Sequence, residues 1–264
     1  MSQQGVEAYQ AERAAALEIF KGLSEEEWDL PSGCEGWSTR DVVAHMAASL
    51  HGIVDPALMP DLSGGTEPAM EGPVAERRSW PIEQVLEEYE TYSEQAGNVF
   101  VMAQEPPMAD MEFAMNDLGT HKMSMFASTF TFDAYTHLRH DILAPRGSIE
   151  RPEPPRDEAR VGATLEWLLA GLPWMCAAQL GFVDRPVALT LTGPGGGTWT
   201  IAPGGDDGRV TVSDGADAAA VATITSDAHN FVAWSTHRRP WSECVTIEGD
   251  ADYAGRVLDA IRLI

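Results

Sequence analysis

Apolar residues recur three and four positions apart in four segments of the first 150 residues, which is the spacing of amphipathic helices. These segments are residues 6–23, 42–54, 81–100 and 122–143. Ser38 and Asp41 precede the second segment with the spacing of a capping box, and Pro81 suits the first turn of the third. Longer connections separate the last three segments, so we expect a four-helix bundle in residues 1–150.

The pattern changes after residue 150. Residues 148–159, SIERPEPPRDEA, are polar and rich in proline, so we place the domain boundary between residues 150 and 151. A helix is expected at about 158–180, and short alternating segments typical of strands follow it together with two more helical segments. The strands are expected at 186–192, 198–202, 209–213, 219–226 and 244–249, and the two helices at 227–237 and 253–264. We therefore expect an α+β protein of two domains, the second of which, residues 151–264, has an antiparallel sheet.

Charge is distributed unevenly between the two predicted domains. Residues 1–150 carry 8 Lys and Arg against 26 Asp and Glu, a balance of −18, whereas residues 151–264 carry 9 against 15, a balance of −6. The total of −24 repels nucleic-acid phosphates and anionic lipid headgroups. We therefore expect no nucleic acid and no membrane as partners. Separately, we expect a small molecule as substrate and a monomer or a homodimer.

The cysteines and the first residues of the sequence indicate the cellular compartment of the protein. Cys34, Cys176 and Cys244 lie far apart and include no CxxC pair, so neither a disulfide framework nor a cysteine-based zinc site is predicted. The first residues lack a basic start followed by an apolar run, and no stretch of about 18 apolar residues occurs in the chain. These features predict a cytoplasmic protein.

The usual motifs of a protein nucleophile are absent from the sequence. G-x-S-x-G does not occur, and no cysteine is placed beside a histidine in a way that indicates catalysis. The segment GPGGGTWT, residues 193–200, lacks the lysine and helix of a phosphate-binding loop, so we predict a hairpin turn there. Any nucleophile is therefore expected from outside the chain.

The predicted helix 122–143 has one face that begins apolar and ends ionisable. Its members are Met123, Phe126, Phe130, Asp133, His137 and His140. Burying a carboxylate and two imidazoles without partners costs several kcal/mol, roughly, and a divalent metal would compensate for that cost. Asp133 and His137 are one turn apart, a spacing at which two side chains can chelate one ion. An ordinary ion pair at the helix surface is the alternative interpretation of these two residues.

His45 in the predicted helix 42–54 is the third candidate ligand. It lies near the edge of the apolar face of that helix, and small or polar residues such as Ala48, Ser49 and Gly52 follow along the same stripe. With Asp133 and His137, it would complete a three-ligand site that has an open position, as catalytic metal sites do. Alternatively, His45 is a partly exposed histidine that pairs with Asp41.

His140 and Asp141 need separate roles, because four ionisable groups within nine residues cannot all bind one ion directly. We assign His140 either to the residues that contact the ligands or to the wall of the active site. Asp141 is predicted to orient the second ring nitrogen of His137, a common role for a carboxylate next to a ligating histidine.

Two motifs in the first domain resemble those of a known family. CEGWSTRDVVAHMA (residues 34–47) and FDAYTHLRHDI (residues 132–142) are similar to the motifs of the mycothiol-dependent maleylpyruvate isomerase family, which belongs to the DinB-like metal-binding bundles. HRRPWSECVTIEGDADYAGRVLDAI (residues 237–261) resembles the end of that family's sterol-carrier-like second domain. The resemblance covers nearly the whole chain.

The resemblance implies a divalent metal of the zinc type, held by the residues that match the family's ligands, His45, Asp133 and His137. It also implies the thiol mycothiol as cosubstrate, which would attack a small electrophile as the thiolate once the metal lowers its pKa. An isomerase would add the thiol to a cis double bond, allow rotation and then eliminate it. A transferase would keep the thioether.

The sequence departs from the family pattern at two positions. The acidic ligand is usually Glu, and Asp133 is shorter by one methylene. His140 stands where the family usually has Asp, and Asp141 follows it. A basic residue implicated in the family's active site matches Arg238 or Arg239, and an arginine would suit a carboxylate on the substrate or cofactor.

Two other functions are compatible with these residues. The first is a non-catalytic small-molecule-binding or resistance protein, which would keep the helix bundle and bind a small molecule without converting it. A metal-dependent hydrolase or cyclase would use bound water and need no thiol.

Overall fold

The computed structural model describes residues 2–204 and 207–264, and the chain divides into two compact units. The first comprises Met1–Asn116 and Thr120–Pro155, and the second comprises Asp117–Gly119 and Arg156–Ile264. The division therefore falls after Pro155 and not after residue 150. Arg139 explains the difference, because its guanidinium donates a hydrogen bond of 2.9 Å to the Pro155 carbonyl and so ties the linker to the first unit. Among the described residues, no helix is long and apolar enough to cross a membrane.

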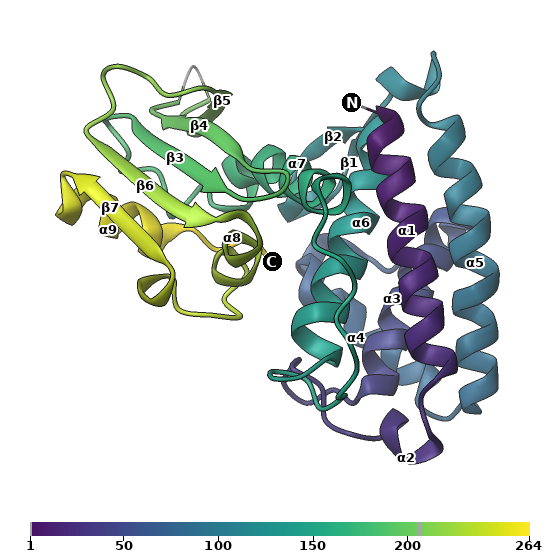
Figure 1. Ribbon diagram of the computed structural model, residues 1–264. Coiled ribbons are helices and arrows are strands. Elements are labelled where there is room, and N and C mark those ends of the chain that lie inside the picture. The colour runs from purple at the N-terminus through teal and green to yellow at the C-terminus, as the bar shows by residue number, and fades with distance from the viewer. Residues whose placement is uncertain (1, 205–206) are drawn as a thin grey trace. The chain divides into compact units, whose positions relative to one another are not determined.

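The first unit is a helix bundle whose long members follow the predicted segments closely (Figure 1). The four bundle helices are α1 (Ser2–Lys21), α3 (Thr39–Val54), α5 (Ile82–Met102) and α6 (Phe126–Thr136). The smaller elements are α2 (Glu25–Trp28), α4 (Thr66–Arg77), β1 (Glu112–Ala114), β2 (Thr120–Lys122) and the 3₁₀ turns η1 (Pro56–Leu58), η2 (Leu62–Gly64), η3 (Met108–Asp110) and η5 (Met123–Met125). A further 3₁₀ turn, η4 (Asn116–Leu118), begins at the last residue before the segment Asp117–Gly119, which is assigned to the second unit. Helix α1 packs against α5 and α6, and α3 packs against α5.

The fourth bundle helix differs from the prediction at both ends. Helix α6 begins at Phe126, because β2 and the 3₁₀ turn η5 occupy the preceding residues. It ends at Thr136 and continues as a π-helix, η6 (His137–Ile142), which the amide of Leu143 closes by donating to the Leu138 carbonyl. A π-turn is wider than an α-turn and occurs frequently at functional sites.

Helix α4 lies in the connection that the sequence analysis left without a helix. Pro73 and the glycines around it hide the helical period in the sequence. In the structure, Met70, Val74 and Arg77 are buried at spacings of four and three, so one face of α4 packs against the bundle.

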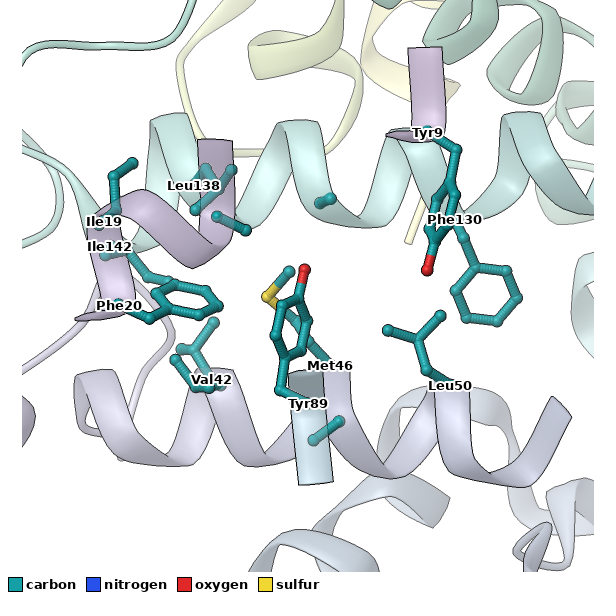
Figure 2. Packing of buried hydrophobic residues seen from close by; sticks show 14 of the residues in the cluster. Tyr9, Ile19, Phe20, Val42, Met46, Leu50, Tyr89, Phe130, Leu138 and Ile142 are labelled. Carbon is teal, nitrogen blue, oxygen red and sulfur yellow. The ribbon is translucent and has the colours of Figure 1, made fainter. Parts of the chain in front are cut away.

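The core of the bundle is formed by facing side chains of α3, α5 and α6. Val42, Met46 and Leu50, four residues apart on α3, project toward Phe130 and Leu138 on the opposite helix (Figure 2). All five side chains are buried, and each buried side chain of this size contributes about 1.5–3 kcal/mol to folding. The apolar period of the sequence therefore identified the inner faces correctly.

A buried ion pair joins the π-helix to α1. Both side chains are fully buried, and the guanidinium of Arg139 donates to the two carboxylate oxygens of Glu12 at 2.8 and 2.9 Å. The Arg139 guanidinium also lies 3.7 Å from the centre of the Tyr135 ring. The ion pair therefore fixes the position of η6, which begins directly after Thr136.

The second unit is a five-stranded sheet with helices packed against it (Figure 1). The strand order is β5-β4-β3-β6-β7. The elements are α7 (Glu158–Met175), β3 (Val187–Thr192), β4 (Gly197–Ala202), β5 (Thr211–Asp214), β6 (Ala222–Asp227), α8 (Ala228–Ser235), the 3₁₀ turn η7 (Trp241–Glu243), β7 (Val245–Gly249) and α9 (Ala251–Ala260). The expected α+β class is confirmed, but the sheet is mixed, because β3 and β6 pair in parallel while the other three pairings are antiparallel.

The segment GPGGGTWT forms the turn between β3 and β4, as predicted. Gly193 and Gly195 have φ angles of 87° and 70°, which side chains rarely adopt and which a tight turn requires here. The segment therefore reverses the direction of the chain between the two strands.

Replacing Arg139 by Ala is expected to lower the free energy of unfolding by about 3–5 kcal/mol, because it leaves Glu12 buried without its partner. Urea-induced unfolding measures the loss. Arg151→Ala is the control, because Arg151 pairs with Glu27 at the surface and such pairs contribute less than about 1 kcal/mol. Equal losses in the two variants would contradict the assigned role of the Arg139–Glu12 pair.

Candidate metal centre

A capping box fixes the N-terminus of α3, the helix that carries His45. The Ser38 side chain accepts from the amide of Asp41 at 3.2 Å, and the Asp41 carboxylate accepts from the amide of Ser38 at 3.1 Å, which is the predicted capping box. His45 follows about one turn later, and 14% of its side chain is exposed. The cap thus fixes the start of the helix that carries the imidazole.

His45, Asp133 and His137 come together in the first unit. The Asp133 Oδ1 atom lies 3.4 Å from Nε2 of His45 and 3.5 Å from Nε2 of His137. One ligand atom from each residue lies within 4.8 Å of the others, and the two imidazole centres are 5.0 Å apart. Ligand atoms around a tetrahedral zinc ion lie about 3.3 Å apart, so these three residues fit a divalent metal.

The π-helix places a carboxylate behind His137. The Nδ1 atom of His137 and Oδ2 of Asp141 are 2.8 Å apart, and the Asp141 side chain is fully buried. The Arg146 guanidinium pairs with the other Asp141 oxygen, and the Gly33 amide donates to the Asp141 carbonyl at 2.7 Å. With Nδ1 directed at Asp141, the Nε2 atom that faces Asp133 can serve as a metal ligand once it has lost its own proton.

The electrostatics of the site couple Asp133 to His137. Burial alone raises the pKa of Asp133, but hydrogen bonds and charge from His137 and His45 outweigh burial and hold this pKa well below its usual range. Burial alone lowers the pKa of His137, but Asp133 and Asp141 outweigh it and raise this pKa well above the usual value. In the absence of a metal, the proton on His137 therefore balances the carboxylate charge.

Cys34 is a functional candidate that the sequence analysis missed. Its sulfur forms a second group of potential ligand atoms with His137 and Asp141. Asp141 already pairs with His137 and Arg146, so the group with His45 and Asp133 offers the freer ligands. The spacing of cysteines along the chain could not reveal Cys34, because tertiary packing of the loop at Gly33 brings it to the π-helix.

His140 belongs to neither group of ligand atoms among the described residues. It is half-buried, and its carbonyl accepts a hydrogen bond of 3.3 Å from Arg146. His140 lies within the π-helix, where a turn holds more residues than in the α-helix assumed for the sequence pattern. Its predicted role in the wall of the site stays a prediction.

Arg238 and Arg239 lie in the second unit, just after α8. The Arg239 guanidinium lies 3.2 Å from Glu243 and donates to the Asn230 side chain at 3.2 Å. Both arginines line a pocket of about 320 Å³ together with Trp234, His237, Pro240, Trp241, Leu258, Asp259 and Ile261. Their predicted catalytic role stays a prediction.

Residues 9–107 match the family described as "Mycothiol maleylpyruvate isomerase N-terminal domain". The match covers 99 of the 264 residues, all of them in the first unit, which is therefore similar to this family. The matched residues include His45 and end before Asp133, so the match covers one of the three clustered residues. The resemblance inferred from the motifs is thereby confirmed for the family.

Two solved structures share the fold of the chain. The structure of the mycothiol-dependent maleylpyruvate isomerase has a TM-score of 0.59 at 14% identity, with 94% of this chain and 93% of that chain covered. A histidine-to-alanine variant of that enzyme has a TM-score of 0.57 at the same identity and coverage. At this identity the likeness shows the fold alone. A comparison with curated protein sequences found no match.

The metal-free protein should show a pH-dependent contribution of His137 to stability. Because the pKa of His137 is raised in the folded state, its contribution is fully present below about pH 6.5 and is lost as the pH rises through the folded value. Wild type and His137→Gln, unfolded by urea in the presence of a chelator, should therefore differ most near about pH 6 and converge at alkaline pH.

His237→Asn is the matched control, because it removes a histidine of the second unit and reports the background effect of pH. A difference between wild type and His137→Gln that grows with pH would contradict the protonated pair.

Proposed function

We propose that this protein binds one divalent metal ion through His45, Asp133 and His137 and uses it to activate a thiol cosubstrate of the mycothiol type. The substrate is a small electrophile, and the reaction is an isomerisation or an S-transfer. The observation that carries the proposal is the approach of two Nε2 atoms, from helices far apart in the sequence, to one Asp133 oxygen at 3.4 and 3.5 Å.

The donor set agrees with zinc chemistry. Two imidazole nitrogens and one carboxylate oxygen make three protein ligands and leave a position for an incoming ligand, as in catalytic zinc sites. A bound divalent metal would lower the pKa of a coordinated thiol and so supply the nucleophile that the chain's own motifs lack. The shorter Asp133 side chain still reaches both histidines, so a glutamate is not required for this ligand set.

The chain's own residues prepare the site for this chemistry. Asp141 orients His137, and Arg146 neutralises the second Asp141 oxygen. Buried neighbours such as Met46 and Phe130 line the bundle interior beside α3 and α6 and keep bulk water out (Figure 2). A thiol that adds to a cis double bond here and is then eliminated yields the trans isomer, whereas a thiol that displaces a leaving group yields a thioether.

The proposal includes a small-molecule substrate and a cytoplasmic location, where a thiol cosubstrate stays reduced. The family of the N-terminal unit and the shared isomerase fold support the thiol and the type of reaction.

Metal content and thiol consumption test the proposal directly. We expect about one zinc-type ion per chain in the purified protein, and its loss in His137→Gln and Asp133→Asn, because each variant removes one of three ligands. His237→Asn should keep the metal. Conjugation or isomerisation of a panel of electrophiles with mycothiol should need the metal, and chelation should abolish it.

The alternatives give different results in the same experiments. Ligand binding that resists chelation, without thiol consumption, would indicate a non-catalytic binding protein. Metal-dependent turnover without any thiol would indicate a hydrolase or cyclase. A metal-free protein whose His137→Gln variant is unchanged in stability and activity would exclude the metal centre.

A further inference from the structure

The two histidines of the metal centre are held by different means. His137 is oriented by the hydrogen bond of 2.8 Å between its Nδ1 atom and Asp141. The Nδ1 atom of His45 is buried, and within residues 2–204 and 207–264 it has no hydrogen-bond partner. Ligating histidines almost always use their second nitrogen in such a bond, so something else must orient the His45 ring.

Besides His137, whose ring centre lies 5.0 Å away, Trp37 packs against the His45 ring. The indole and imidazole centres are 5.5 Å apart, and the planes are inclined by 45°. This distance is within the range of aromatic pairs that stabilise each other by about 0.5–1.5 kcal/mol beyond their buried area. The indole can therefore restrict the imidazole only if the indole itself is fixed.

A closed circuit of hydrogen bonds fixes the indole. Trp37 Nε1 donates to Glu71 at 2.9 Å, and Arg78 donates to the other Glu71 oxygen at 2.7 Å. Arg78 also donates to Asp41 at 3.1 Å, and Asp41 accepts from the amide of Ser38, the residue after Trp37, at 3.1 Å. The circuit thus starts and ends at the segment that begins α3.

Helix α4 supplies the acceptor of this circuit and is anchored independently of it. Arg77, at its end, donates to Glu88 of α5 at 2.6 and 2.7 Å, and Glu88 also contacts His51 of α3 at 2.7 Å. Hydrogen bonds from Arg78 and Trp37 lower the pKa of Glu71, which keeps it an anionic acceptor at neutral pH. Glu71 therefore offers the indole a fixed partner from outside α3.

We propose that Trp37 is the positioning residue for His45, and that Glu71 on α4 locks it in place. The indole takes the role that Asp141 has for His137, by packing in place of a hydrogen bond. This inference rests on the proposed metal centre. It also gives α4, an element outside the four bundle helices, a direct influence on metal geometry.

Metal affinity in matched variants tests the inference. Trp37→Ala should weaken zinc binding about tenfold, the lower end of the effect of losing an outer partner of a ligand, and Asp141→Asn provides the benchmark of about 10- to 100-fold. Glu71→Ala should weaken binding several-fold. Glu71→Gln keeps an amide oxygen that accepts from the indole and should stay within about twofold of wild type. Competition with a chromophoric chelator measures all four variants.

The control and the double variant separate positioning from general damage. Glu67→Ala changes an exposed carboxylate one turn earlier on α4 and should leave affinity unchanged. The double variant Trp37→Ala/Glu71→Ala should bind no more weakly than Trp37→Ala alone, because Glu71 acts through Trp37. At saturating Co²⁺, the visible d–d spectrum should change in Trp37→Ala and Glu71→Ala and not in Glu67→Ala. Glu71 is exposed, so its variants keep the fold even if Trp37→Ala does not.

Two outcomes would overturn the inference and are distinguishable from failure of the metal centre. Wild-type affinity and an unchanged cobalt spectrum in Glu71→Ala and Trp37→Ala would exclude positioning by the indole while leaving the metal centre intact. Additive losses in the double variant would show that Glu71 acts by another route. If wild type itself binds no metal, the proposed function and this inference both fail.

Discussion

The rest of the first unit is organised around one carboxylate placed between two imidazoles inside a helix bundle. Asp133 has little exposed surface, and a charge in that position is tolerated only when partners compensate for lost hydration. His45 and His137 provide that compensation in the metal-free protein, and a cation held at the same atoms would provide it more strongly. The stability of this part of the bundle and the metal chemistry proposed for it therefore involve the same three side chains.

The scaffold keeps these groups in register by contacts of two kinds. Apolar packing of α3 against α5 and η6 sets the spacing between these helices, and Figure 2 shows buried side chains of all three. Polar contacts then set the orientation, because the Arg139–Glu12 pair pins the π-helix and Asp141 turns the His137 ring. Apolar packing is non-directional, so it cannot by itself orient a ligand atom toward the site. Polar contacts alone would not bring the helices together.

The family match and the shared fold describe the scaffold and not the chemistry of the site. The helix bundle and the mixed sheet correspond to the solved isomerase over 94% of the chain, although 14% of the residues are identical. A fold is maintained by many interchangeable apolar contacts, whereas a site depends on a few side chains of defined chemistry. The three ligand candidates and Trp37 are therefore more informative about function than the overall likeness.

Periodicity and capping chemistry were sufficient to predict the four bundle helices, the strands of the second unit and the turn at Gly193. These features depend on neighbours in the sequence, so local physics determines them. The sequence also predicted that His45, Asp133 and His137 lie together and that Asp141 contacts His137, because Asp133 and His137 interrupt an apolar face at helical spacing, and these side chains are close in the structure. Their role as metal ligands stays a prediction. The tertiary structure alone decided the parallel pairing of β3 with β6, the approach of Cys34 to His137 and Asp141, and the Trp37–Glu71 contact. Each of these joins residues whose relation exists only once distant segments have packed, and no local spacing encodes it.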